Sequence, residues 1–323
     1  MDEGTEYASN SLLGVIRFGD KNLSDAEASN LIQPTAFMKA LKWIEASSGG
    51  TTHKMTLKTG APSAQFRAIN EGIVNTAGTE LTLDMSLKFL DAGIVEDVAL
   101  VTADSKGKEH YMNKRAMESL DAGFSSVEYQ LIRGIGWGAA GCKGLADYIS
   151  LYKGMTYDAG GAGGERVYFM VMAENAVCGV VGNEGEFADG EIYQTRVTTD
   201  VATGAGYEAY GLPINGYLGL QVAGLYSLAM GFNFDGTSTH DVTDKACGRI
   251  FNKFPSAVQP KVNGILMSRA GRLQLQESRT YTSATGTRAP LPTEWEGIPI
   301  YVSDACASDT STITTTTSTT TTT

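Results

Sequence analysis

The most suggestive chemical pattern in this 323-residue sequence is a glycine motif near its centre. Gly136–Gly141 matches the G-x-G-x-x-G pattern of dinucleotide-binding loops, in which glycines let a pyrophosphate approach a helix N-terminus. That chemistry requires a strand before the glycines, whereas the sequence predicts a long helix there. Asp147, the nearest acid downstream, also comes too soon to contact a ribose. We therefore interpret the glycines as a flexible helix exit and expect no cofactor.

A second candidate is a polar cluster that could bind a metal or transfer a proton. His240-Asp241 stands close to Asp235 and Asp244, and imidazoles and carboxylates serve as metal ligands and as general acids or bases. The same residues precede an apolar helical pattern. There, Asp241 or Thr243 suits an N-cap, and Asp244 favours the helix dipole. We predict a helix start at this point rather than a metal or acid–base site.

The remaining polar candidates match no catalytic or ion-binding motif. An acidic run interleaved with glycines lacks the register of a calcium loop, so we predict a solvated turn. No serine lies in a nucleophile-elbow sequence. The residues concerned are Glu184, Glu186, Asp189, Glu191, Ser268 and Ser303. We expect no catalytic, cofactor-binding or metal-binding residues, and no enzyme activity.

Cysteine and histidine usage leads to the same expectation. The four cysteines are far apart and form no C-x-x-C pair, so we predict free, buried thiols in a reducing compartment. None of the three histidines lies near a cysteine in the sequence, which disfavours a zinc site. These residues are Cys142, Cys178, Cys247, Cys306, His53, His110 and His240.

Composition indicates a globular, acidic protein. Hydrophobic residues make up 42% of the chain and charged residues 19%, which is typical of a folded domain. The 36 acidic and 25 basic side chains leave a net charge of −11, the opposite of what a dedicated nucleic-acid binder needs. The sequence has no apolar run of membrane-spanning length, and Met1–Gly4 does not begin a signal peptide. We expect the protein to be intracellular when it is made.

The elements that would position any functional residue begin with a polar arm. The first thirty residues are mixed and mostly polar. A helix is then predicted from Pro34 to about Ala46, because proline suits a helix start and Gly49-Gly50 would end it. Its apolar face comprises Phe37, Leu41 and Ile44.

Two strands with period-two alternation follow, separated by about twenty residues. Met55 alternates with Lys54 and Thr56 in the first strand, which predicts one buried and one solvated face. The apolar residues of both strands are Met55, Leu57, Leu81, Leu83, Met85, Leu87 and Phe89. Because so long a loop is uncommon inside a compact domain, we predict an extended hairpin that reaches outward. Arg67 and Glu71, at its tip, are either contacts with another subunit or two solvated side chains.

A period of three to four residues then marks one side of a long helix from Ser105 to Ile135. Gly123 weakens the helix locally by about 1 kcal/mol relative to alanine, which allows a bend or break there. The apolar positions are Met112, Ala116, Leu120, Phe124, Val127, Leu131 and Ile135. The polar positions expected on the exposed side are Lys108, Lys114, Arg115, Glu118 and Glu128.

The rest of the chain alternates strands with short helices. Strands are predicted at 167–173, 176–181, 192–197 and 217–222, followed by a helix at 243–254, a strand at 262–267, a helix at 269–279 and a strand at 297–304. After Asp309 the sequence is almost pure threonine with serine. Such low complexity favours disorder, although threonine also favours strands and could be ordered against a neighbouring copy.

Several short segments resemble one family when they are taken in order. They are Phe89–Asp97, Gly144-Leu145, Gly219–Val222 with Asn233, Ile265–Arg269, Leu273–Gln276 and Gly297–Asp304. Together with the predicted hairpin and long helix, they resemble the major capsid proteins of tailed bacteriophages with the Hong Kong 97 fold, in a podovirus-like branch.

The resemblance implies an α+β fold with named parts. These are an N-terminal arm with its first helix (1–50), an E-loop hairpin (51–90), a P-domain (91–222) with a spine helix at about 105–135, an A-domain with a closing strand (223–308) and a Thr-rich tail (309–323). The sequence shows no slot for the Lys and Asn pair that cross-links shells in the type member. Lys54 and Lys58 are therefore not assigned that role.

The resemblance also implies a function. The chain is expected to self-assemble into pentamers and hexamers that form the icosahedral head of a tailed double-stranded DNA phage. Expected partners are further copies of itself, the portal, and scaffolding or cement proteins, with DNA enclosed without sequence-specific binding. Expected locations are the virion and, during assembly, the bacterial host cytoplasm. The alternatives are an encapsulin-like nanocompartment shell, another structural phage protein such as a tail tube or decoration subunit, and an enzyme with a glycine-rich cofactor site.

Overall fold

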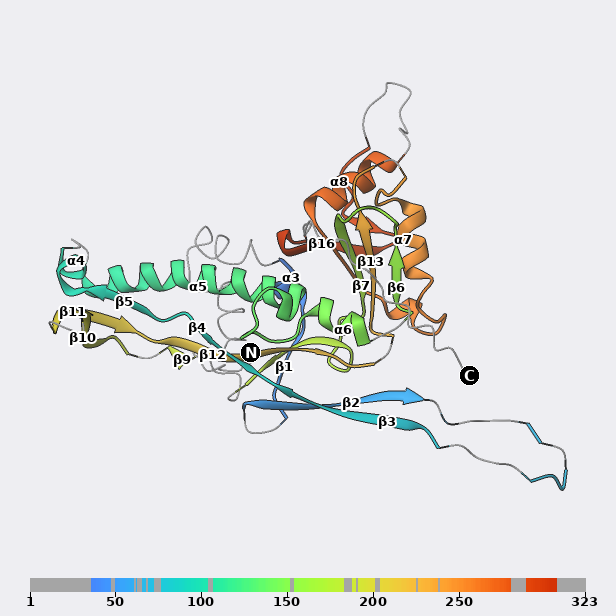
Figure 1. The fold of residues 1–323 in the computed structure, drawn as a ribbon, viewed down its shortest axis with the longest axis horizontal. Coiled ribbons are helices and arrows are strands. Elements are labelled where there is room, and N and C mark those ends of the chain that lie inside the picture. The colour runs from blue at the N-terminus through green and yellow to red at the C-terminus, as the bar shows by residue number, and fades with distance from the viewer. Residues whose placement is uncertain are drawn as a thin grey trace, which may run out of the picture. The chain divides into compact units, whose positions relative to one another are not determined.

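The computed structural model describes residues 36–47, 50–60, 62, 66–67, 69–72, 77–103, 107–151, 154–182, 188–189, 191–200, 204–224, 226–237, 239–279 and 289–306. The fold is α+β, as predicted (Figure 1). The chain forms two compact units. Unit 1 comprises residues 1–147 and 173–225, and unit 2 comprises residues 148–172 and 226–323.

Unit 1 contains one long helix and most of the strands. Its elements are α3 (Ala36–Ala40), β1 (Trp43–Glu45), β2 (Thr52–Gly60), β3 (Thr79–Ser86), β4 (Lys88–Asp91), β5 (Ile94–Asp97), α4 (Val98–Thr102), α5 (Lys108–Arg133), the 3-10 turn Gly134–Gly136, β8 (Val177–Val181), β9 (Ala188–Asp189), β10 (Tyr193–Asp200), β11 (Ala205–Leu212) and β12 (Ile214–Val222). Helix α6 (Leu145–Leu151) spans the boundary between the units in the sequence.

The strands of unit 1 form three sheets. A five-stranded sheet has the order β1-β8-β12-β4, with β9 paired to β12. A three-stranded sheet has the order β10-β11-β5, and β2 and β3 form an antiparallel hairpin. The long strand β12 is buried over most of its length, because it lies in the middle of the five-stranded sheet. Helix α5 contacts both β5 and β12.

Helix α5 confirms the predicted long helix and corrects two details. The helix is continuous through Gly123, so the break that this residue allowed does not occur. Glu128, expected on the exposed side, is only 3% exposed. Its carboxylate accepts hydrogen bonds from the backbone N–H groups of Phe37 (3.2 Å) and Met38 (3.5 Å). A buried acid is stable there because the start of α3 supplies donors that have no partner within the helix.

The predicted first helix is wrong in its second half. The helix α3 ends at Ala40, and Trp43–Glu45 instead form strand β1, which pairs in parallel with β8. Phe37 and Leu41 are buried as expected, but Ile44 lies in the strand. The pairing partner comes from more than 130 residues away, so local periodicity could not reveal it.

Unit 2 is a six-stranded mixed sheet with two short helices. The strand order is β15-β16-β14-β7-β13-β6. Its elements are β6 (Thr156–Asp158), β7 (Glu165–Met170), β13 (Leu228–Phe234), α7 (Asp244–Phe251), the 3-10 turn Gln259–Lys261, β14 (Gly264–Met267), α8 (Arg269–Ser278), β15 (Glu294–Trp295), β16 (Ile298–Val302) and the 3-10 turn Asp304–Cys306. Strands β7, β13 and β14 are almost entirely buried and form the core of this unit.

Most of the other predicted elements are present. The predicted strands correspond to β7, β8, β10, β12, β14 and β16, and the predicted C-terminal helices correspond to α7 and α8. No prediction anticipated β6, β11 or β13. The arm up to residue 35 and the threonine tail lie outside the described residues. Among the helices of the described part, none is both long and apolar enough to cross a membrane.

Candidate subunit-contact surfaces

The β2–β3 hairpin carries an apolar face and a polar face, because its strands alternate in register. Met55 lies opposite Leu83, and His53 lies opposite Met85. The polar face places Lys54 opposite Asp84, and opposite charges facing each other across an antiparallel pair stabilise it. We use "apolar face" below for the described side chains on the first of these faces, namely His53, Met55, Leu81, Leu83 and Met85.

The apolar face is covered only at the base of the hairpin. Met55 is 5% and Met85 8% exposed, whereas Leu81, farther out, is 48% exposed. At the base, Met85 packs in a cluster with Leu87 and Val180. The described residues of the chain therefore bury one end of this face and leave the other open to solvent.

A buried histidine ties the hairpin base to the five-stranded sheet. His53 is 6% exposed, and its Nδ1 accepts a hydrogen bond from the backbone N–H of Ser47 at 3.2 Å. The ring proton is therefore on Nε2, which lies 2.6 Å from Oε1 of Gln221 in β12. The Gln221 amide donates in turn to the carbonyl of Glu174 at 2.8 Å. This chain of hydrogen bonds joins β2 to β12 and to the turn before β8.

The tip of the hairpin presents two large apolar side chains. Phe66 and Ile69 are 107% and 93% exposed. Arg67 donates from Nη1 to the backbone carbonyl of Glu71 at 3.0 Å, and Asn70 adopts a left-handed backbone conformation with φ of 69°, as turns often require. We call residues 66–71 the "tip"; of these, residue 68 lies outside the described residues.

The sequence singled out Arg67 and Glu71, and the structure brings these two residues together at the tip. The guanidinium of Arg67 contacts the main chain of Glu71, which stabilises the turn. Sequence reasoning missed Phe66 and Ile69. Their signal was available, because large apolar residues in a polar loop have no core to enter.

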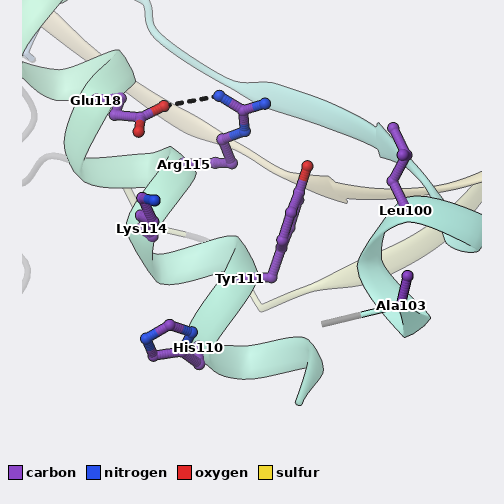
Figure 2. A pocket seen from close by; sticks show the side chains of 7 residues that line it. All are labelled: Leu100, Ala103, His110, Tyr111, Lys114, Arg115 and Glu118. Carbon is purple, nitrogen blue, oxygen red and sulfur yellow. Dashed lines mark hydrogen bonds and ion pairs between the residues drawn. The ribbon is translucent and has the colours of Figure 1, made fainter. Parts of the chain in front are cut away.

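An open groove lies between α4 and the first half of α5 (Figure 2). Its volume is about 490 Å³, and its lining is Leu100, Ala103, His110, Tyr111, Lys114, Arg115 and Glu118. Leu100 is 56% exposed. The N-cap of α4 is Asp97, whose carboxylate accepts from the N–H of Ala99 at 2.8 Å and so holds this short helix in place.

The two basic side chains of the groove, Arg115 and Lys114, differ in their ion pairs. Arg115 donates to Glu118 at 2.8 Å and lies 3.4 Å from Glu96, and its guanidinium stands over the ring of Tyr111. The hydrogen bond to Glu118 is the main cause of a raised Arg115 pKa. Lys114, one residue earlier, has no ion-pair partner among the described residues. The groove therefore offers apolar surface beside a cation.

The glycine motif after α5 lacks the strand that the dinucleotide-binding pattern requires before it. Helix α5 precedes the glycines, as the sequence predicted. Oδ2 of Asp147 accepts hydrogen bonds from the backbone N–H groups of Ile135 (2.8 Å) and Gly144 (2.9 Å). An acid thus occupies the donors that an anion would need. Trp137 stacks on Tyr129 with ring centroids 5.0 Å apart.

The polar cluster of unit 2 is a helix start, as predicted. Thr243 is the N-cap of α7, and its hydroxyl accepts from the N–H of Ala246 at 3.1 Å. His240 lies 3.6 Å from Asp235, and burial is the main cause of a raised Asp241 pKa. Among the described residues, no three His, Cys, Asp or Glu side chains are grouped to hold a metal ion.

The cysteines and serines considered in the sequence analysis have structural positions. All four cysteines are free and buried, as predicted. Ser268 caps α8 through a 2.9 Å hydrogen bond to the N–H of Gly271, and the Ser303 hydroxyl accepts from the N–H of Ala305 at 3.3 Å. Glu184 and Glu186 of the acidic run lie outside the described residues.

Comparison with solved structures identifies this arrangement. A chain in the structure of bacteriophage Epsilon15 matches with a TM-score of 0.62 and 16% identity, over 83% of this chain and 86% of that chain. A chain of the bacteriophage JBD30 capsid matches with a TM-score of 0.52 and 9% identity, over 84% of this chain and 91% of that chain. No protein-family model matches the sequence, and no curated protein matches it. The fold of this chain is therefore that of tailed-phage major capsid proteins, as the sequence motifs predicted.

Proposed function

We propose that this chain is a major capsid protein that assembles into the icosahedral head of a tailed double-stranded DNA phage. The observation that carries the proposal is the apolar face of the β2–β3 hairpin. Met55 and Met85 are covered at its base, yet Leu81 and the tip residues Phe66 and Ile69 are exposed. Large exposed apolar side chains of this kind are costly in water unless a partner covers them.

Identical copies are the partner that the fold favours. Surfaces that meet repeatedly under symmetry close into rings and shells. We infer pentamers and hexamers in which the hairpin acts as the E-loop and overlaps the next subunit. Helix α5 acts as the spine of the P-domain, and unit 2 acts as the A-domain around the local axis. Arg67 and Glu71 then lie at the boundary between subunits, with Arg67 shaping the turn that makes the contact.

The negative net charge is consistent with a shell protein and not with a sequence-specific nucleic-acid-binding protein. A net charge of −11 limits attraction to phosphate, so the packaged DNA would be enclosed without sequence-specific contacts. We infer that the portal and scaffolding or cement proteins are partners, and that the mature location is the virion after assembly in the host cytoplasm. No catalytic step is part of this function.

The test is to express the chain alone and to image it by negative-stain electron microscopy. Angular shells or sheets of hexamers are expected. A stable, monodisperse monomer at high protein concentration would argue strongly against the proposal. Shells that copurify with a protein cargo, and that come without DNA-packaging functions, would instead favour an encapsulin-like compartment.

A matched pair of variants links the result to the hairpin. Phe66→Ser with Ile69→Ser removes the exposed apolar groups and should suppress assembly while the subunit stays folded, because neither side chain is buried within it. Thr82→Ser, on the solvated face of the same hairpin, is the control and should assemble normally. Circular dichroism and thermal unfolding of both variants verify that the fold is intact.

A further inference from the structure

We propose that the base of the β2–β3 hairpin is an acid-sensitive joint, in which protonation of His53 loosens the hairpin from the five-stranded sheet. The inference goes beyond the proposed function, because it assigns a conformational switch to the single, unassembled chain. It is carried by the hydrogen bonds and the burial of one histidine.

The base of the hairpin is attached by an apolar seat and a polar tie. Among the described residues, strands β2 and β3 pair with each other and join no other sheet. In the apolar seat, Met85 and Leu87 pack against Val180. The fit over the sheet is close, because a Cβ added to Gly219 would lie 2.6 Å from Cδ2 of Leu87. The polar tie is the chain of hydrogen bonds through His53, and it is the part that can respond to a proton.

The polar tie requires a neutral imidazole. Nδ1 of His53 accepts from the backbone N–H of Ser47 at 3.2 Å, so this nitrogen carries no proton. Nε2 lies 2.6 Å from Oε1 of Gln221 and donates to it, and the 2.8 Å bond from the Gln221 amide to the carbonyl of Glu174 fixes that orientation. A second ring proton would therefore place two N–H donors against each other between Nδ1 and Ser47.

A protonated ring would also lack a counter-charge. His53 is 6% exposed, and among the described residues its ring forms no ion pair with a carboxylate. Glu174 gives the tie only its carbonyl, since its carboxylate pairs with Lys42 at 2.8 Å. The hydrogen bond from Lys42 lowers the pKa of Glu174, so this carboxylate stays with its lysine in mild acid. A buried charge without a partner is unfavourable.

The other side chains around the ring do not supply that charge. Met85 lies directly opposite His53 on β3 and is apolar. Cys178 of β8 pairs with Gln221 in the sheet, and burial raises its pKa to about 12, so this thiol stays neutral. The charged and titratable side chains nearest the ring on the elements around it are Lys42, Glu45, Lys54, Asp84, Glu174 and Cys178. Of these, Lys54 and Asp84 lie on the polar face of the hairpin, and Glu45 is exposed at the end of β1.

Proton uptake therefore favours the loosened hairpin. The ring is neutral while the base is attached, and it can be charged once the base is released into water. Because the released state binds more protons, the attachment weakens as the pH falls. Histidine gains its charge in mild acid, so we expect the attachment at full strength above about pH 7 and its progressive loss towards about pH 5. Since the hairpin carries the exposed Leu81, acid would change how this apolar side chain is presented.

The test is hydrogen–deuterium exchange of the unassembled full-length chain at about pH 7.5 and about pH 5, on either side of histidine titration. Mass spectrometry follows the amides of residues 52–55 and 83–86, with rates corrected for the intrinsic pH dependence of exchange. These amides should exchange about tenfold faster at the lower pH, because a state that takes up one proton gains about tenfold in population per pH unit. Equal corrected rates at the two pH values would overturn the proposal.

A matched pair of variants assigns the response to one histidine. His53→Gln keeps an N–H donor near the Nε2 position but does not titrate, so its corrected rates should be the same at both pH values. His240→Gln makes the same substitution in unit 2 and should keep the native acid response. An acid response that persists in His53→Gln would overturn the proposal, and so would its loss in His240→Gln.

The outcomes separate this proposal from the proposed function. If the chain forms shells but the hairpin shows no acid response, the joint is overturned and the capsid function stands. If the acid response is present and depends on His53 while the chain never forms multimers, the joint stands and the capsid function is overturned.

Discussion

At the scale of single residues, buried polar groups determine how segments distant in sequence are joined. Glu128 lies on the buried side of α5 and accepts hydrogen bonds from the N–H groups of Phe37 and Met38 in α3. His53 and Gln221 join the hairpin to the five-stranded sheet. Both arrangements depend on every partner being present, because an unpaired polar group in the interior costs more than a paired one contributes.

Glu128→Ala should destabilise the attachment of α3. The substitution leaves the N–H groups of Phe37 and Met38 buried without an acceptor, at an expected loss of about 1–3 kcal/mol in unfolding free energy. Asn113→Ala, at an exposed position of the same helix, should change stability by less than about 0.5 kcal/mol. Urea unfolding of the two variants provides the measurement. Equal stability of both would show that Glu128 does not hold α3.

Two substitutions at His53 separate its two hydrogen bonds. His53→Asn keeps an acceptor near the Nδ1 position that faces Ser47 but loses the link to Gln221, whereas His53→Gln keeps a donor near Nε2. We expect amide exchange in β2 and β3 of the unassembled subunit to be about fivefold faster in His53→Asn, as the loss of about 1 kcal/mol implies. His53→Gln should exchange nearly as slowly as the native protein. The reverse order would show that the Ser47 contact, not Gln221, holds the hairpin.

At the scale of elements, α5 is organised by its apolar stripe, and a glycine in its middle does not interrupt it. Gly123 faces Ala92, whose Cβ would lie 3.5 Å from an added methyl group. Packing near Ala92 and Leu90 of β4 therefore offsets the intrinsic helix penalty of this residue, which is about 1 kcal/mol. The hairpin differs, because its alternating strand pattern continues past the buried Met55 and Met85 to Leu81, which is 48% exposed.

Gly123→Ala should stabilise the protein by about 0.5–1 kcal/mol, because the helix gains propensity and the new methyl group meets only ordinary contacts. Gly134→Ala is the counterpart, at a position with φ of 71° beside the carboxylate of Asp147. It should destabilise the protein by more than about 1 kcal/mol. Thermal unfolding of the two variants should move in opposite directions, and a loss of stability in Gly123→Ala would show that the helix is strained there.

At the scale of the whole molecule, the chain crosses between two units more than once. Residues 148–172 leave unit 1 and supply β6 and β7 to the sheet of unit 2, after which the chain returns to unit 1 at 173. Each unit has its own buried core and two of the four cysteines. Cys142 and Cys178 lie in unit 1, and Cys247 and Cys306 lie in unit 2.

Alkylation of the thiols should therefore report on each unit separately. Burial raises the pKa of Cys142 to about 11 and the pKa of Cys178 and Cys247 to about 12, and the thiolate is the reactive form. At pH 8 the native protein should react slowly at all four. As urea increases, the two thiols of a unit should become reactive together, because a compact unit opens cooperatively. Mass spectrometry of the labelled peptides measures this, and independent behaviour of Cys142 and Cys178 would contradict it.

The sequence by itself determined the elements whose pattern is local. Alternation in Met55 and Leu81–Met85 specified the hairpin strands, the three-to-four residue period specified α5, and Thr243 specified the start of α7. Order and short motifs were then sufficient to predict the fold class. The polar side chains proposed for the tip, Arg67 and Glu71, were located by the length of the loop.

Only the tertiary structure decided which surfaces are covered. Strand β1, the burial of Glu128 and the grouping of 148–172 with unit 2 all depend on partners far away in the sequence. The same holds for the groove, whose lining residues come from two helices. Periodicity reports which face of an element is apolar, whereas burial depends on what packs against that face. That difference is why Leu81 belongs to an apolar strand face in the sequence and proves to be 48% exposed.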